Sequence, residues 1–189
     1  MQRYVERLVE SARGRPIMQF NRIDFRLPWF RKVFPNARLV HLYRHPREQW
    51  CSSLMGIEGF PRTGRMEDFE PHDKFYLRNW ASDLKYQFPF LDEREVRHPY
   101  SLFYYLWKLS YLYGSVHSHY SVSYERLMDA PAVEISRLFD FLEIDTFDLD
   151  RVLSLVSEPR REKWREYASQ DWFARIESEC EKTLGEFFA

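Results

Sequence analysis

The sequence predicts an α/β fold in which a parallel sheet is flanked by helices and the C-terminal half of the chain is rich in helix. Short apolar segments typical of strands alternate with segments whose apolar residues recur every three or four positions, as on one face of a helix. Strands that alternate with helices indicate a parallel sheet. The 189 residues, 44% of them hydrophobic, suffice for one core, so we expect a single domain over residues 1–189.

The N-terminal part of the chain is predicted to form a helix, a strand and a second helix. Residues 2–12 have apolar residues at helical spacing, and Gly14 is expected to end this helix. The short apolar run over residues 16–20 predicts a strand. Residues 27–33 predict a short helix that stops before Pro35, because the residue before a proline disfavours helical backbone.

A buried strand and a helix are predicted next, followed by a long loop. Residues 38–43 predict the strand, and Arg44 stands at its C-terminal end. Pro46 suits the first turn of a helix that would extend to about residue 55. Glycine, proline and charged residues dominate residues 56–71, which predicts a loop of a length that is often functional.

The remainder of the chain is predicted to be mostly helical. An apolar stripe over residues 102–113 predicts a helix that Gly114 ends. Residues 120–124 predict another short strand, and helical spacing of apolar residues predicts helices over residues 131–142 and 173–187.

The net charge of −1 conceals one strongly basic segment. From Arg13 to Arg47 the chain has nine basic residues and a single acidic one, Asp24. Dedicated nucleic-acid-binding domains are usually basic overall, so a near-neutral chain predicts no nucleic-acid partner. A concentrated basic segment attracts anions, and a solvated basic face is the alternative explanation.

Composition also indicates where the protein works. No apolar run approaches the roughly 20 residues of a membrane span, and the N-terminus lacks the pattern of a secretory signal. Cys51 and Cys180 have neither metal-ligand nor disulfide-framework spacing, which fits a reducing compartment. We therefore expect a cytoplasmic protein without a membrane span and without a metal site.

An anion site is predicted where the strand over residues 38–43 meets the following helix. The free N–H groups at the start of that helix and the guanidinium of Arg44 would point into one crevice, at the carboxyl end of a parallel strand. Ser52, eight residues after Arg44, would add a hydroxyl. Alternatively, Arg44 pairs with a carboxylate and Ser52 only faces a neighbouring helix.

The same stretch resembles a segment of a known enzyme family. A strand followed by Arg-x-Pro-Arg, with a serine eight residues after the first arginine, resembles the 3′-phosphate-binding segment of sulfotransferases that use 3′-phosphoadenosine 5′-phosphosulfate (PAPS). The resemblance implies that Arg44 and Ser52 bind the 3′-phosphate of PAPS or of its product adenosine 3′,5′-bisphosphate. It also implies a parallel sheet like that of P-loop NTPases.

Three further motifs of that family occur in the expected order. Residues 123–127 resemble its "YEDL" segment, which implies that Tyr124 contacts the adenine, while Glu125 is expected to tie loops together. The helix over residues 131–142 ends like the family's "FLG" element, with Glu143 in place of the glycine. Residues 163–166 resemble its "KWR" element.

A basic pair precedes the "KWR" element. By the resemblance, Arg160 and Arg161 would clamp the 3′-phosphate, although the glycine that follows this pair in cytosolic relatives is Glu162 here. An aromatic-rich segment over residues 75–113 would shape the acceptor side, or serve only as core.

Two expected parts of a sulfotransferase are not evident. The family carries a second phosphate loop of the P-K-x-G-T type after its first strand, and nothing before Arg44 matches it. Residues 59–65 have a similar spacing but lack the lysine and the hydroxyl of such a loop. We therefore expect the chain to be the C-terminal two thirds of a full domain, incomplete at its N-terminus.

The catalytic base is the other part that is not evident. Transfer to an alcohol or amine needs a group that accepts the acceptor's proton. His72 is the first candidate, whereas His41 in a strand is more typical of a core histidine, and the base of many family members lies upstream of the residues matched here.

The resemblance implies transfer of a sulfuryl group from PAPS to a hydroxyl or amine of a small-molecule or carbohydrate acceptor. The alternative is a non-catalytic nucleotide-binding or interaction module of the same fold. A third possibility is an unrelated helical interaction protein with a basic face. The acceptor and the oligomeric state cannot be read from the sequence.

Overall fold

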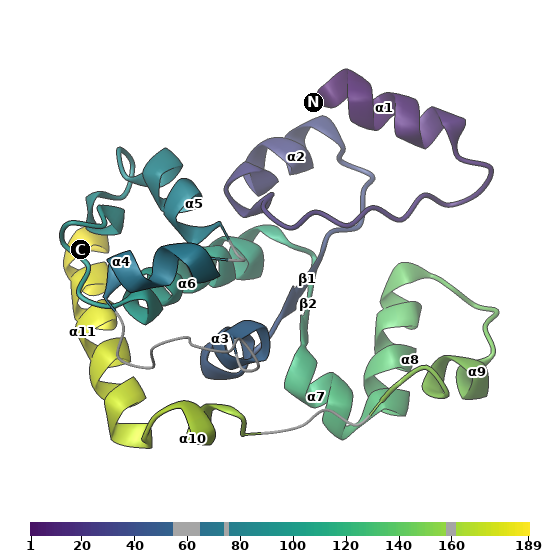
Figure 1. Cartoon of the computed structure of the whole chain (residues 1–189). Coiled ribbons are helices and arrows are strands. Elements are labelled where there is room, and N and C mark those ends of the chain that lie inside the picture. Colours follow the sequence, from purple (N-terminus) through teal and green to yellow (C-terminus); the bar gives the residue numbers. More distant parts are fainter. Residues whose placement is uncertain (55–64, 74–75, 158–161) are drawn as a thin grey trace.

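One two-stranded parallel sheet and many helices make up the described part of the chain, residues 1–54, 65–73, 76–157 and 162–189 of the computed structural model (Figure 1). In chain order the elements are α1 (Gln2–Ser11), η1 (Asp24–Arg26), α2 (Leu27–Val33), β1 (Val40–Tyr43), α3 (Pro46–Leu54), α4 (Met66–Phe69), η2 (Glu70–His72), α5 (Leu77–Leu84), η3 (Pro89–Leu91), α6 (Pro99–His117), β2 (Tyr120–Ser123), α7 (Tyr124–Asp129), α8 (Pro131–Leu142), α9 (Leu149–Leu153), α10 (Trp164–Tyr167) and α11 (Gln170–Phe188). None of these helices has the length and apolar character that crossing a membrane requires.

The mixed α/β class and the parallel pairing predicted from the sequence are confirmed. β1 and β2 pair in parallel, with Val40 opposite Tyr120 and Tyr43 opposite Ser123. Both strands are short, and the larger sheet of a P-loop NTPase stays a prediction, because the described residues contain these two strands only. The pairing brings the carboxyl ends of both strands to the same edge.

The prediction that residues 38–43 form a buried strand is only half right. The strand exists, but Val40 is 38% exposed and Leu42 is 60% exposed. α8 covers the neighbouring strand instead, where Val122 is buried and the ring of Tyr120 stacks on that of Phe141 at 5.0 Å between centroids. Within the described part of the chain, the side chains of β1 are therefore packed against a helix only on the side that faces α6.

The strand predicted over residues 16–20 is wrong. This stretch is extended but belongs to no sheet, and Ile17 is 85% exposed. A strand needs a neighbour for its backbone hydrogen bonds, and no strand of the described chain lies beside this segment. The preceding helix ends at Ser11 rather than at Gly14, since the extended backbone of Ala12 already stops it.

The long helix α6 is the centre of the fold. It packs against β1 and β2 and also against α11, α5, α3 and α2, as Figure 1 shows for its central position. The prediction that Gly114 ends this helix is wrong, because the helix continues through it to His117. Gly114 is instead the site where α6 approaches the sheet, and a Cβ there would lie 2.6 Å from the ring of His41.

His41 is held in place on the α6 side of β1. Its ring lies 5.3 Å from that of Tyr43 and 5.9 Å from that of Tyr111, and burial lowers the pKa of His41. It therefore occupies the structural position that the sequence suggested for it.

The remaining helices gather around an aromatic core. α3, α5, α6, α10 and α11 supply most of its side chains, and Trp50, Tyr100 and Phe173 are among those fully buried. The helix predicted over residues 173–187 is confirmed by α11, which buries Phe173, Ile176, Cys180 and Leu184 on one face.

The loop predicted over residues 56–71 is partly wrong. Residues 55–64 lie outside the described part of the chain, including most of the 59–65 segment. The rest is helical, because Met66 and Phe69 are buried and the carboxylate of Asp68 accepts a hydrogen bond from the backbone N–H of Arg65 at 3.1 Å.

We predict that Gly114→Ala lowers the free energy of unfolding by about 1–3 kcal/mol, because a methyl group has no room between α6 and the His41 ring. Gly185→Ala on α11 is the matched control, since a Cβ there meets no atom within 4 Å. It should leave stability unchanged or raise it by up to ~1 kcal/mol, through the higher helix propensity of alanine. Urea unfolding followed by circular dichroism measures both, and equal effects of the two substitutions would contradict the close approach.

Candidate functional site

Two strand-to-helix junctions lie side by side at the carboxyl edge of the sheet. β1 leads through Arg44 and His45 into α3, and β2 leads directly into α7. Pro46 begins α3, a position where a missing N–H costs nothing. Ser123 caps α7, since its side chain accepts a hydrogen bond from the backbone N–H of Arg126. Pro46 and the Ser123 cap thus explain why a helix begins directly after each strand.

Glu125 joins the two junctions. Its carboxylate accepts a hydrogen bond from the backbone N–H of His45 at 2.8 Å and another from the hydroxyl of Ser123 at 3.0 Å. The expectation that Glu125 ties loops together is therefore met, through a backbone N–H. The α3 junction is fixed to the α7 junction without use of the Arg44 side chain.

Arg44 and Tyr124 are brought together at this edge. The guanidinium carbon of Arg44 lies 4.6 Å from the centroid of the Tyr124 ring, within the range of a cation–π contact. The indole N–H of Trp107 donates a hydrogen bond to the carbonyl of Arg44 at 3.0 Å, which anchors the junction to α6. Two residues 80 positions apart thus form one surface.

The charge of Arg44 is only partly matched by the chain. Among the described residues, Arg44 pairs with Glu48, whose Oε2 lies 3.6 Å from Nη2, too far for a good hydrogen bond. Nε of Arg44 and Oε2 of Glu48 are both buried, and neither has a hydrogen-bond partner within the part of the chain that the structure describes. Buried donors are normally satisfied, so this guanidinium N–H lacks an acceptor, which the described residues do not supply.

Ser52 is exposed and lies one helical turn after Glu48 on α3. Its hydroxyl donates a hydrogen bond to the carbonyl of Gln49 at 3.0 Å, so it would have to rotate to donate to a bound anion. Its role in phosphate binding stays a prediction.

Arg47 anchors the start of α3 to the C-terminal helix, a role that the sequence reasoning missed. Its guanidinium donates two hydrogen bonds to Glu177, at 2.8 and 2.6 Å, and the Tyr100 hydroxyl donates to the same carboxylate at 2.6 Å. These bonds raise the pKa of Arg47, while burial raises that of Tyr100. Both members of the ion pair are largely buried.

Aromatic rings enclose this ion pair. The guanidinium carbon of Arg47 lies 5.1 Å from the centroid of Trp164 and 5.2 Å from that of Phe173. Trp164 belongs to the segment that resembles the "KWR" element, so Arg47 holds that segment against α3. No local spacing could have revealed this, because Arg47 and Glu177 are 130 residues apart.

The cysteine in α3, Cys51, is fully buried. Burial raises the pKa of Cys51 to about 12, and the negative charge of Glu48 acts in the same direction. The positive charges of Lys163 and Arg44 act on the pKa of the same thiol in the opposite direction. A thiol that stays protonated at neutral pH is a poor nucleophile.

The predicted roles of three further residues stay predictions. Arg160 and Arg161 lie outside the described part of the chain. His72 is half-buried at the end of η2, next to α4, and its role as a base stays a prediction.

Comparison with protein-family models gives a match over residues 19–148, described as "Sulfotransferase family". The match covers more than half of the chain and includes Arg44, Ser52 and Tyr124. Neither the curated proteins nor the solved structures contain a match to this chain.

We predict that Glu177→Ala lowers the free energy of unfolding by about 3 kcal/mol, because it leaves the charge of Arg47 and the hydroxyl of Tyr100 buried without an acceptor. Glu186→Ala, in the same helix, removes an exposed pair with Lys182 and should cost at most ~0.5 kcal/mol. Urea unfolding of both variants measures the difference, and similar midpoints would show that the Arg47 pair does not anchor α3.

Proposed function

The chain belongs to the sulfotransferase family, and on that basis we propose that it transfers a sulfuryl group from PAPS to a hydroxyl or amine acceptor. The observation that supports this most is the unpartnered guanidinium N–H of Arg44 at the shared carboxyl edge of the two strands. Ligands of parallel α/β folds bind at this edge. Residues 1–189 act as one sulfotransferase-like unit in this proposal.

Arg44 supplies the charge that a 3′-phosphate needs. A guanidinium can donate two parallel hydrogen bonds to phosphate oxygens, and the free N–H groups at the start of α3 face the same edge. Tyr124 lies beside it and offers a ring and a hydroxyl to the adenine. Ser52, Arg160 and Arg161 complete the proposed set of contacts to adenosine 3′,5′-bisphosphate.

The reaction is an in-line displacement at sulfur. The acceptor oxygen or nitrogen forms a bond to sulfur, while the bond between sulfur and the bridging phosphate oxygen breaks, and adenosine 3′,5′-bisphosphate leaves with that bonding pair. The acceptor's proton passes to a base, for which His72 is the candidate. The residues described here hold the nucleotide in position, and positioning is a large part of catalysis in a transfer between two bound substrates.

The acceptor is proposed to be a small molecule or a carbohydrate, and the compartment to be the cytoplasm. The buried thiols of Cys51 and Cys180, both free, support a reducing compartment.

We predict that adenosine 3′,5′-bisphosphate binds to the chain, and that Arg44→Ala weakens this binding roughly 10- to 100-fold, the usual effect of one lost charge-assisted contact. Arg151→Ala is the matched control, because this exposed arginine belongs to α9, which packs against α8 and lies away from β1 and α3 (Figure 1). Isothermal titration calorimetry measures the affinity. Absence of binding by the unmutated chain would overturn the proposal, as would an equal loss in both variants.

Turnover is then assayed with radiolabelled PAPS and a panel of carbohydrate and small alcohol or amine acceptors. Label transferred by the unmutated chain, and reduced by Arg44→Ala, supports the enzyme. Binding of adenosine 3′,5′-bisphosphate with no transfer to any acceptor would contradict catalysis and favour the non-catalytic nucleotide-binding module.

A further inference from the structure

Glu48 places a carboxylate beside Arg44, at the carboxyl edge of the two strands. It lies in the first turn of α3, where the positive end of the helix dipole favours a negative side chain. Its Oε2 atom lies 3.6 Å from Nη2 of Arg44, beyond the range of a hydrogen bond. The side chain of Glu48 is 12% exposed and that of Arg44 is 22% exposed, so the pair is enclosed but still reaches the molecular surface.

Each member of this pair has a buried polar atom whose hydrogen-bonding capacity is unused. Within the described part of the chain, Nε of Arg44 is a donor without an acceptor, and Oε2 of Glu48 is an acceptor without a donor. A guanidinium only donates hydrogen bonds, and an ionised carboxylate only accepts them. The pair is therefore completed by a ligand that offers an acceptor to Arg44 and a donor to Glu48.

Two other carboxylates beside the strand-to-helix junctions already have donors. Glu125 accepts hydrogen bonds from a backbone N–H of the α3 junction and from a serine hydroxyl of the α7 junction. Glu177 accepts hydrogen bonds from Arg47 and from the hydroxyl of Tyr100. Of these three carboxylates, Glu48 is the one with a buried oxygen that no donor reaches within the described residues.

We propose that Glu48 accepts a hydrogen bond from the 2′-hydroxyl of the nucleotide ribose and thereby selects adenosine 3′,5′-bisphosphate over its 2′-deoxy form. The inference rests on the proposed function, in which Arg44 binds the 3′-phosphate. The 2′-hydroxyl is on the ribose carbon next to the one that carries this phosphate, so a phosphate held by Arg44 brings the hydroxyl to the neighbouring carboxylate. The phosphate then supplies the acceptor that Arg44 lacks, and the hydroxyl supplies the donor that Glu48 lacks.

The charge of Glu48 and its hydrogen bond have different effects on binding. Its negative charge repels the phosphate of either nucleotide, so a neutral residue at this position should strengthen the binding of both. The hydrogen bond, by contrast, favours only the nucleotide with a 2′-hydroxyl, because the 2′-deoxy form leaves an enclosed carboxylate without a donor. A carboxylate that served only to balance the charge of Arg44 would affect both nucleotides equally.

Isothermal titration calorimetry of the chain with adenosine 3′,5′-bisphosphate and with 2′-deoxyadenosine 3′,5′-bisphosphate tests the proposal. The unmutated chain should bind the 2′-deoxy form roughly 10- to 100-fold more weakly, as expected for the loss of a hydrogen bond to a charged group. Glu48→Met keeps the length of the side chain but has no carboxylate, so the two affinities should agree within about 2-fold. Glu48→Gln keeps a neutral acceptor oxygen and should retain a difference of about 3- to 10-fold.

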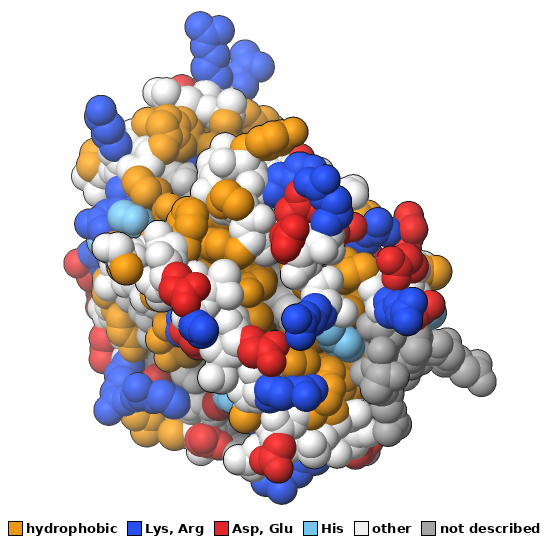
Figure 2. Space-filling model, turned by 90° about the vertical axis from the view of Figure 1, so that its left-hand side faces the viewer, with side chains coloured by type: hydrophobic (Ala, Val, Ile, Leu, Met, Phe, Trp, Pro, Cys, Tyr) orange, Lys and Arg blue, Asp and Glu red, His pale blue; other side chains and the backbone are white. Residues whose placement is uncertain are grey.

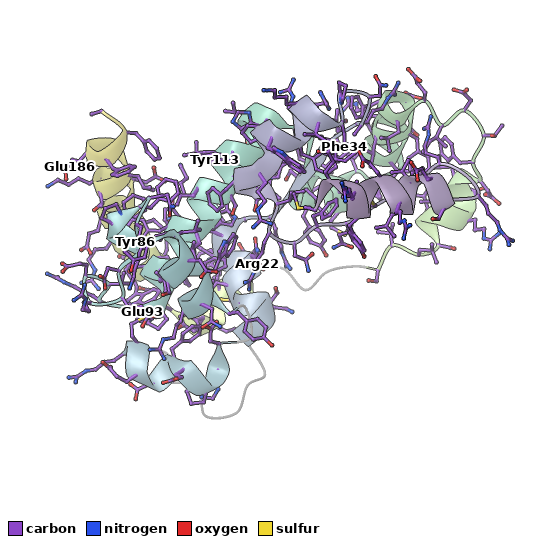
Figure 3. The ribbon with its side chains drawn as sticks, turned by 90° about the horizontal axis from the view of Figure 1, so that it is seen from above. Arg22, Phe34, Tyr86, Glu93, Tyr113 and Glu186 are labelled. Atoms are coloured by element: carbon purple, nitrogen blue, oxygen red, sulfur yellow. The ribbon has the colours of Figure 1, made fainter. Side chains whose placement is uncertain are left out.

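Glu186→Met is the matched control, because Glu186 is an exposed glutamate at the far end of another helix. Figure 3 shows Glu186 at the outer end of α11, and Figure 1 shows that this end of α11 lies away from α3. On the α11 side of the molecule, Lys and Arg side chains lie interspersed with Asp and Glu side chains at the surface (Figure 2). The control variant should distinguish the two nucleotides as strongly as the unmutated chain does.

Equal affinities of the unmutated chain for the two nucleotides, with binding that still depends on Arg44, would overturn the role of Glu48 and leave the proposed function standing. A difference that persists in full in Glu48→Met would also overturn it, because another group would then bind the 2′-hydroxyl. Absence of binding of either nucleotide would overturn both proposals. The comparison on the unmutated chain needs no substitution, so it decides the matter even where circular dichroism shows that Glu48→Met does not fold.

Discussion

The packing of α6 against the two parallel strands holds the fold together. Gly114 lets the helix approach the His41 ring, and Trp107 of the same helix donates a hydrogen bond to the carbonyl of Arg44. The helix thereby fixes both the sheet and the residue that follows its first strand. Its other faces pack against α11 and α3, so the aromatic core and the strand ends share one rigid support.

Because α6 fixes the strand ends, it also determines which side chains meet at the carboxyl edge of the sheet. Arg44 is held on the ring of Tyr124, and Glu125 secures the backbone beside it, while Arg47 is committed to Glu177. Of the two arginines in the Arg-x-Pro-Arg motif, one is thus used by the fold and the other keeps an unpartnered N–H.

Sequence reasoning succeeded where local chemistry decides and failed where distant partners decide. The resemblance implies that Arg44 and Tyr124 contact the same nucleotide, and the structure brings the two residues together because the carboxyl ends of the parallel strands meet at one edge. Pro46 and the apolar spacing of α11 were equally informative. The sequence does not reveal the pairing of Arg47 with Glu177, and the pattern around Gly114 predicts a helix end although this glycine serves a close approach of α6 to His41. The prediction of a strand over residues 16–20 is wrong because no strand of the described chain pairs with this segment. A local pattern does not reveal whether such a partner is present.

The chain differs from the family's motifs at two glycine positions, and the backbone conformation at both can be described. Glu143 and Glu162 stand where the resembling motifs have glycine, and both adopt left-handed backbone, with φ of 53° and 57°. Glycine is favoured there because side chains disfavour this conformation, and at position 143 an ion pair with Arg38 accompanies the strain. The backbone conformation expected of the motif is therefore kept although the residue has changed.

A crystal structure of the chain with adenosine 3′,5′-bisphosphate tests most directly whether the sheet edge at Arg44 and Tyr124 is a nucleotide site. We expect a phosphate group within hydrogen-bond distance of the Arg44 guanidinium and in front of the first N–H groups of α3, with the adenine beside Tyr124. A nucleotide bound elsewhere, with Arg44 still turned to Glu48 and Tyr124 alone, would contradict this expectation.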